Sequence, residues 1–175
     1  MRGRQPVLLF VIALAASLPL WSYVAFPKSS PTSVPVTIVR LDARFDKLVP
    51  RDAKLEKIAD GFTWVEGPVW NRKGQYLLFS DIPKNSVFKW KEGEGVSLFL
   101  NPSGYMGSAP FEGPEPGSNG LTYDAAGRLV LCAHGDRRIA RLEPDGRKIT
   151  LADRYEGKRI NSPRSEEHTS ELQSR

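Results

Sequence analysis

The feature that most constrains the fold is a repeat in the middle of the chain. The segment VEGPVWNRKGQYLLFSD at 65–81 aligns without a gap with SNGLTYDAAGRLVLCAH at 118–134, at an offset of 53 residues. If one residue is then lost, SVFKW at 86–90 aligns with RIARL at 138–142. A further apolar run follows each copy, VSLFL in the first and KITLAD in the second. Two related units therefore lie in tandem.

Each unit is predicted to hold four short strands joined by tight turns. Apolar runs of four to six residues alternate with turn sequences such as NRKG and PDG, and helical periodicity is absent. A four-stranded unit repeated in tandem is typical of a β-propeller blade, which buries its faces only against neighbouring blades. The sequence thus predicts an all-β fold with about two blades. GYMGSAPFEGPEPG at 104–117 is expected to be a loop inserted between them.

Charge and cysteine content exclude some function classes. The formal net charge of +5 is modest, and no dense basic run alternates with aromatic residues, so we expect no nucleic-acid partner. Cys132 is the only cysteine and lies in an apolar run, which excludes an intrachain disulfide and predicts a buried thiol.

The N-terminal part is predicted to direct export. Arg2 and Arg4 precede an uncharged apolar run at 7–26, which is long enough to span a bilayer as a helix. Residues 1–26 are therefore either a cleaved signal peptide or an uncleaved membrane anchor. Residues 27–53 begin with a segment rich in Pro, Ser and Thr and are predicted to form a linker. The domain that follows, 54–163, is expected to be periplasmic or extracellular.

Two polar residues occupy equivalent positions in the repeat. Glu66 aligns with Asn119, and each precedes a glycine where the innermost strand of its blade begins. In a propeller such positions converge on the central channel. A carboxylate and an amide oxygen suit Ca²⁺ or a similar divalent ion. The alternative is that both side chains only hydrogen-bond to turn backbone.

The chain resembles a known family in these same segments. WVEGPVW and the long run EPGSNGLTYDAAGRLVLCAHGDRRIARLEPDGRKITLADRYEGKRINSP are similar to the SMP-30/gluconolactonase/LRE-like family, and most of all to its bacterial gluconolactonases. The likeness extends over about 55–163. It implies a six-bladed β-propeller with one divalent metal in the central channel, Ca²⁺ in preference to Zn²⁺. Many members hydrolyse sugar lactones, and others act on organophosphates or different esters.

The resemblance assigns roles to several residues. Glu66 matches the Glu of the family's E-G-P motif and is implied to be a metal ligand; a second E-G-P at Glu112 lies outside the repeat. Asn119 is implied to bind either metal or substrate. Asn161 opens a match to the family motif N-S-P-N-D, whose Asn lies at or near the metal, but Arg164 follows Pro163 where that motif continues with Asn. The general base, an Asp, is expected in a later blade, so no catalytic residue is assigned in this chain.

Asn161 and two further residues are weaker candidates for substrate contacts. His134 follows the second strand of the second unit and is either a channel-mouth residue or an ordinary turn residue. Arg159 precedes the predicted third blade and is either a substrate contact or a solvated charge. Glu115 is expected to be structural.

The last twelve residues, RSEEHTSELQSR at 164–175, break the pattern. Position 164 is where the repeat and the family motif both predict an Asn that opens the third blade. The string matches a translated adapter oligonucleotide of sequencing libraries, so we expect a non-native tail and a truncated protein.

The sequence therefore predicts the N-terminal part of an exported, metal-dependent sugar-lactone hydrolase, with the fragment itself inactive. The alternative is a non-catalytic propeller that binds a partner and holds a structural ion. Substrate, native metal, oligomeric state and residues beyond Pro163 are left open by the sequence.

Overall fold

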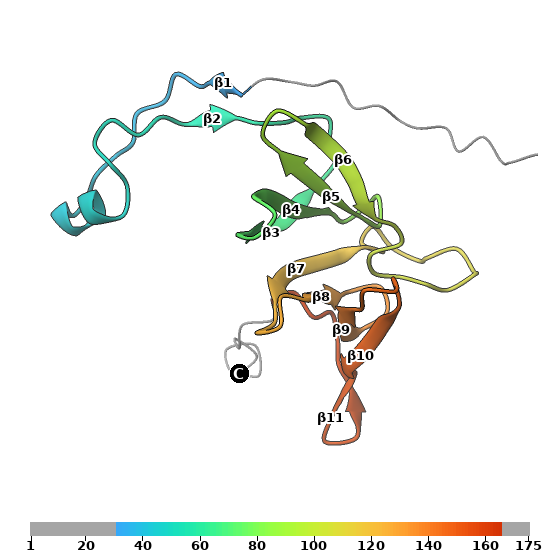
Figure 1. Ribbon diagram of the computed structural model, residues 1–175. Helices are drawn as coiled ribbons and strands as arrows, with labels where there is room; N and C mark the ends of the chain where they lie inside the picture. The colour runs from blue at the N-terminus through green and yellow to red at the C-terminus, as the bar shows by residue number, and fades with distance from the viewer. Residues whose placement is uncertain (1–30, 166–175) are drawn as a thin grey trace, which may run out of the picture.

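The structure is a computed structural model that describes residues 31–165, and its main part is two four-stranded antiparallel sheets (Figure 1). The first sheet contains β3 (Val65–Asn71), β4 (Tyr76–Asp81), β5 (Ser86–Lys91) and β6 (Gly95–Leu100) in that order. The second contains β7 (Ser118–Tyr123), β8 (Leu129–Ala133), β9 (Arg138–Leu142) and β10 (Lys148–Ala152), also in sequence order. Each is a meander, as the repeat predicts, and the all-β propeller class is confirmed.

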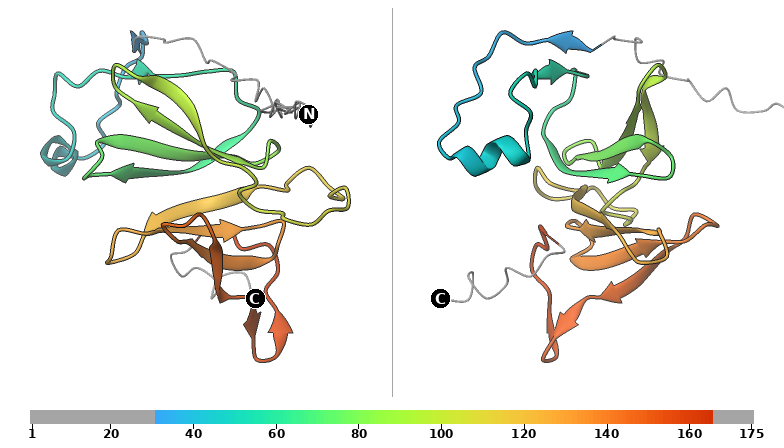
Figure 2. Two further views of the ribbon diagram at one scale, coloured as in Figure 1. Left: turned by 45° about the vertical axis from the view of Figure 1, so that its right-hand side comes forward. Right: turned by 60° about the vertical axis from the view of Figure 1, so that its left-hand side comes forward.

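Smaller elements flank the two sheets. β1 (Thr32–Ser33) pairs with β2 (Glu56–Lys57), and the 3₁₀ helix η1 (Ala43–Lys47) lies between them. β11 (Arg154–Tyr155) and β12 (Lys158–Arg159) form a hairpin beyond β10 (Figure 2). The segment predicted as a linker therefore carries a two-residue strand and a helical turn. The predicted N-terminal apolar helix lies outside the described residues, as does the tail from 166 onward.

No helix within residues 31–165 is long and apolar enough to cross a membrane. The loop 101–117 between the sheets contains no strand, in agreement with the predicted insertion. Its start is fixed by Asn85, whose Oδ1 accepts hydrogen bonds from the backbone N–H groups of Ser103 and Gly104 at 3.1 and 2.7 Å. Its end is fixed by Ser118, whose N–H donates to Ser103 Oγ at 2.9 Å.

The strand registers correct one detail of the predicted repeat. Val65 pairs with Asp81 in the first sheet, and Ser118 pairs with Ala133 in the second, so Asp81 is equivalent to Ala133. The alignment from sequence, which matches Asp81 with His134, is wrong by one residue. The missing residue lies in the first hairpin of the second unit, because the equivalent pairs Trp70–Leu77 and Tyr123–Leu129 enclose six residues in the first unit and five in the second.

The core lies between the two sheets. In the first sheet, Leu78 pairs with Lys89 and Val69, and this face packs against the second sheet. The second sheet contributes the face on which Leu131 pairs with Leu121 and Ala140. The buried apolar residues of this core are Leu78, Val87, Leu121, Leu129, Leu131, Ala133 and Ala140.

The two sheets contact each other through different faces. Leu78 at the interface is equivalent to Val130, whereas Leu131 at the interface is equivalent to Phe79 on the opposite face of the first sheet. We call the face of Val69 and Leu78 the A face of the first unit, and the face of Leu121 and Leu131 the B face of the second. The contact is thus A against B, as expected for stacked repeats. The opposite faces carry exposed apolar side chains: Leu98 on the B face of the first unit and Ile149 on the A face of the second.

Candidate functional site at the start of the inner strands

Glu66 and Asn119 lie on the innermost strands of the two units, β3 and β7, which run side by side (Figure 1). Both strands have an irregular register just after these residues. Gly67 has a φ of 58°, and a Cβ placed there would collide with the backbone carbonyl oxygen of Asn119. Only glycine allows this approach. The glycine after Glu66 therefore sets the spacing between the two strands at the site.

Arg164 lies beside these strands. Its carbonyl oxygen accepts a hydrogen bond from the Gly120 N–H at 2.9 Å, so residue 164 sits next to β7 as Asn119 sits next to β3. Its guanidinium Nη2 lies 2.7 Å from Glu66 Oε1. The hydrogen bond and the charge of Glu66, together with the charge of Glu115, raise the pKa of Arg164. Position 164 therefore reaches the same point as Glu66.

Asn119 is 2% exposed, and only one end of its side-chain amide is hydrogen-bonded. Its Nδ2 donates to Nδ1 of His134 over 3.1 Å, and its backbone carbonyl oxygen accepts from Ser80 Oγ at 3.0 Å. Its side-chain Oδ1 is buried and has no hydrogen-bond partner among the residues that the structure describes. Buried polar atoms are nearly always satisfied, so an oxygen in this state points to a bound ion or water.

Glu115 lies beside His134 and acts on Arg164; together with Glu66 and Asn119 these residues are called the cluster. Glu115 Oε2 lies 3.7 Å from His134 Nδ1, and the charge of Glu115 acts on Arg164. The sequence predicts a structural role for Glu115. The end of the inserted loop, which leads into Ser118, brings Glu115 to the site, and no periodic signal in the sequence indicates this position.

Arg159 and Asn161 lie around the turn that follows His134. The guanidinium of Arg159 donates to the backbone carbonyl oxygen of Asp136 at 3.1 Å, and Asn161 Oδ1 accepts from Arg137 at 3.1 Å. Both residues are exposed. Within the described residues, neither the Arg159 nor the Asn161 side chain hydrogen-bonds to Glu66 or Asn119. The structure thus places them at the edge of the cluster.

The donor set of this cluster suits a hard cation. Within residues 31–165 no group of three or more His, Cys, Asp or Glu side chains is arranged to hold a metal ion. The unpartnered Asn119 Oδ1 and the carboxylate of Glu66 nevertheless supply the oxygen atoms that Ca²⁺ prefers. Glu66 already binds a cation, the guanidinium of Arg164. The residues therefore fit a divalent ion when Arg164 does not hold Glu66.

Asp81 is buried close by but has a structural arrangement. Its carboxylate accepts hydrogen bonds from the backbone N–H groups of Thr63 and Trp64 at 3.1 and 3.2 Å, and lies 3.0 Å from Lys84 Nζ. These contacts hold the residues that lead into β3. Asp81 therefore helps to position Glu66 rather than joining the cluster.

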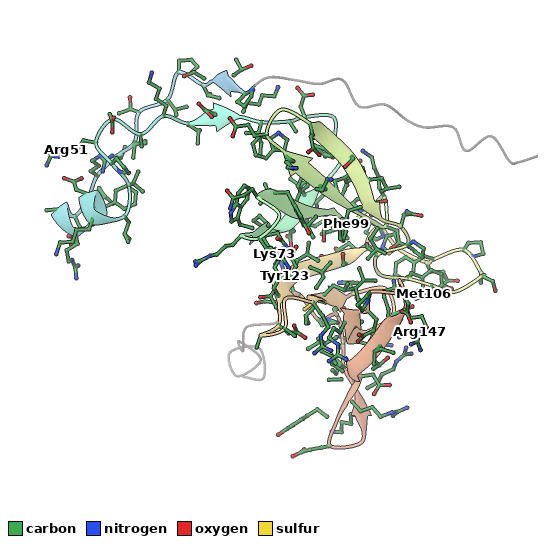
Figure 3. All side chains as sticks on the ribbon, in the orientation of Figure 1. Arg51, Lys73, Phe99, Met106, Tyr123 and Arg147 are labelled. Carbon is green, nitrogen blue, oxygen red and sulfur yellow. The ribbon has the colours of Figure 1, made fainter. Side chains whose placement is uncertain are left out.

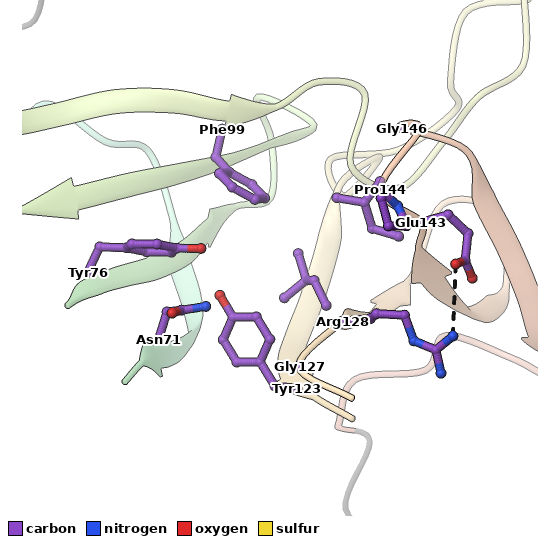
Figure 4. A pocket seen from close by; sticks show the side chains of 11 residues that line it. Asn71, Tyr76, Phe99, Tyr123, Gly127, Arg128, Glu143, Pro144 and Gly146 are labelled. Carbon is purple, nitrogen blue, oxygen red and sulfur yellow. Dashed lines mark ion pairs between the residues drawn. The ribbon is translucent and has the colours of Figure 1, made fainter. Parts of the chain in front are cut away.

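A separate cavity of about 340 Å³ lies between the two units at the far ends of β3 and β7 (Figure 4). Phe99 of the first unit and Tyr123 of the second, both labelled in Figure 3, point into this space from its two sides (Figure 4). The hydroxyl of Tyr123 is buried beside Tyr76 and Asn71, and burial raises its pKa. Asn71, which ends β3, also lines this cavity. Since Glu66 begins the same strand, the cavity lies away from the cluster.

Comparison with known proteins agrees with this architecture. The family model described as "SMP-30/Gluconolactonase/LRE-like region" matches residues 64–165. A gluconolactonase of Zymomonas mobilis is 40% identical over 128 residues, which cover 72% of this chain and 36% of that protein. The chain thus spans little more than a third of that relative.

Solved structures give the same relationship. A gluconolactonase from Xanthomonas campestris superposes with a TM-score of 0.65 at 32% identity, over 80% of this chain and 43% of that one. A second structure, of a protein provisionally assigned as a gluconolactonase, gives a TM-score of 0.58 at 31% identity, over 78% and 41% of the two chains. The match to the family model covers more than half of this chain. The chain therefore belongs to the SMP-30/gluconolactonase/LRE-like family.

Proposed function

We propose that the complete protein hydrolyses a sugar lactone or a similar cyclic ester, in a site that Glu66 and Asn119 help to form. The observation that carries the proposal is the buried Asn119 Oδ1, which lacks a partner among the described residues, while the carboxylate of Glu66 on the adjacent strand is paired with Arg164 of the predicted non-native tail. Family membership and 40% identity to a gluconolactonase support the choice of reaction. A small-molecule lactone is therefore the proposed substrate.

The proposed cofactor is one divalent cation, Ca²⁺ in preference to Zn²⁺. Carboxylate and amide oxygens are ligands that Ca²⁺ prefers, whereas Zn²⁺ favours nitrogen and sulfur. When bound, the cation supplies positive charge that polarises an ester carbonyl. Glu66 and Asn119 would hold it. The group that takes a proton from water is proposed to come from a later blade.

The chain as written is proposed to be inactive, and the complete protein to be exported. Arg164 holds the carboxylate of Glu66, so a divalent ion must compete with a guanidinium for the same oxygens. The apolar run at 7–26 supports export, either with membrane attachment or after cleavage.

The first test concerns the gene. Sequencing source DNA through the codon for residue 164 is expected to give Asn-Asp followed by further blades. A read that returns RSEEHTSELQSR and a stop would remove the basis for a lactonase.

The second test uses the complete protein. Hydrolysis of gluconolactone is expected to stop after a chelator treatment and to return with added Ca²⁺. Glu66→Gln should abolish the metal-dependent rate. Glu112→Gln is the matched control, because Glu112 also stands in an E-G-P sequence but is exposed in the inserted loop. Calcium binding without hydrolysis of any lactone would instead support the non-catalytic binding module.

A further inference from the structure

The contact between Asn119 and His134 decides which end of the Asn119 amide faces the cluster. An amide nitrogen can only donate, and Nδ2 lies 3.1 Å from His134 Nδ1. His134 Nδ1 must then accept, which requires the ring proton to be on Nε2 and leaves Glu115 Oε2, 3.7 Å from the same nitrogen, without a hydrogen bond to it. With Nδ2 used in this way, the oxygen Oδ1 is left as the unpartnered atom.

The opposite arrangement is chemically possible, because an amide can turn by half a rotation. Oδ1 would then accept from a protonated Nδ1, and the Asn119 NH₂ group would face the cluster. An NH₂ group cannot bind a cation. Whether Asn119 presents an oxygen that can bind a cation therefore depends on its hydrogen bond with His134.

We propose that His134 is a positioning residue that fixes the orientation of the Asn119 amide and so presents Oδ1 as a cation ligand. The role of Oδ1 as a cation ligand rests on the proposed function. The orientation of the Asn119 amide depends only on its hydrogen bond with His134 and needs no metal. Partners that orient metal ligands commonly account for 10- to 100-fold in metal affinity.

The location of His134 suits this role. It follows β8 directly, and its side chain is only 20% exposed. The equivalent residue of the first unit is Ile82, because Asp81 matches Ala133. The first unit carries the carboxylate Glu66 at the position of Asn119. A carboxylate presents oxygen in either orientation, so it needs no orienting partner there.

The test compares two substitutions of His134. In His134→Asn the side-chain oxygen lies close to where Nδ1 stands and can still accept from Asn119. In His134→Phe a ring of similar size remains but the acceptor is lost. Both variants are made in the 175-residue chain, and thermal unfolding confirms that they fold. If His134→Phe does not fold, His134→Ala takes its place.

The first readout is metal-free. Nuclear magnetic resonance of the Asn119 side-chain NH₂ group should show one proton protected from exchange in the parent and in His134→Asn, and not in His134→Phe. An unchanged NH₂ signal in His134→Phe overturns the inference, whatever the metal result.

The second readout is Ca²⁺ affinity by calorimetry, with Arg164→Ala introduced in every variant to release Glu66. His134→Phe should bind at least about 10-fold more weakly, and His134→Asn should stay within about 3-fold. Equal affinity in His134→Phe also overturns the inference. If the parent binds no Ca²⁺ but the NH₂ signals behave as stated, the proposed function fails and the positioning role stands.

Discussion

Asp81 shows how a single buried carboxylate shapes the site without belonging to it. It is completely buried and accepts hydrogen bonds from two backbone N–H groups just before β3, while Lys84 contributes a charge from a more exposed position. Removing the carboxylate would leave both N–H groups without an acceptor. Removing the lysine would leave those hydrogen bonds in place.

These two residues should therefore differ in their effects on stability. Asp81→Ala is expected to lower the free energy of unfolding by about 3 kcal/mol, and Lys84→Ala by less than that, because the carboxylate keeps both backbone hydrogen bonds when the lysine is lost. Urea unfolding followed by tryptophan fluorescence measures both. Equal losses would contradict the view that the backbone hydrogen bonds dominate.

Arg164 provides a second prediction at this scale. Its guanidinium bonds to Glu66 and carries a positive charge that opposes a divalent ion at the same oxygens. Arg164→Ala should raise the Ca²⁺ affinity of the chain by about 10-fold or more. Isothermal titration measures it, with Arg159→Ala as the control, because Arg159 contacts Asp136 instead of Glu66. A gain of the same size in the control would argue against a specific effect.

Among the secondary-structure elements, β10 makes an unusual link between the units. Lys148 at its start donates to the carbonyl oxygens of Pro102 and Ser103, at 2.8 and 3.0 Å. These carbonyls belong to the segment that leaves the first unit. Burial lowers the pKa of Lys148 to about 8 from 10.5; the charge of Asp136 opposes this shift, and that of Arg138 adds to it.

This shift predicts a pH dependence of stability. Between about pH 8 and pH 10.5 the unfolded chain keeps its proton on Lys148 while the folded chain loses it. The unfolded state then binds more protons, so the contribution of Lys148 to the free energy of unfolding rises with pH in this window. Lys148→Met should remove that rise. Urea unfolding of both proteins from pH 7 to pH 10.5 gives the difference, and parallel curves would contradict the prediction.

The elements also show what the sequence could and could not predict. Eight strands in two meanders followed from the repeat, because each strand has its own short apolar run and each turn its own Gly or Asn. The position of the one-residue difference did not follow, since Leu77 to Phe79 and Val130 to Cys132 are both apolar and align equally well in two registers. The pairing of backbone groups between strands, which the residue types alone do not determine, places this difference in the first hairpin.

The same limit applies to the cluster. Glu66 and Asn119 could be paired from their positions before equivalent glycines. The approach of Glu115 and the hydrogen bond from Asn119 to His134 could not be predicted, because both depend on how an inserted loop and a turn close in space. Their roles in binding stay predictions.

At the scale of the molecule, the A-against-B packing leaves apolar side chains exposed on part of the other face of each sheet, although Phe79 and Phe88 on the same face as Leu98 are buried. Leu98 on the B face of the first unit is 55% exposed, and Ile149 on the A face of the second is 37% exposed. The chain therefore presents two faces that are complementary in type. Contacts of this kind join copies head to tail.

The 175-residue chain is expected to self-associate through these faces, with an apparent mass in light scattering that rises with concentration. Leu98→Glu or Ile149→Glu alone should give monomers, because every copy then lacks one of the two faces. A mixture of the two variants should form dimers, since each retains the face that the other needs. Leu41→Glu is the control, because Leu41 is 94% exposed and lies on neither sheet. Dimers of a single variant would instead indicate a symmetric contact.

The one-residue difference between the first hairpins has a practical consequence. The two units keep matching registers at the ends that carry Glu66 and Asn119, although their opposite ends differ in length. A change in the number of residues at the turn 72–75 thus leaves the strand register at Glu66 and Asn119 unchanged. That turn offers a place to graft an epitope or a fluorescent label, so that the protein can be followed in a living cell while the arrangement of Glu66 and Asn119 is kept.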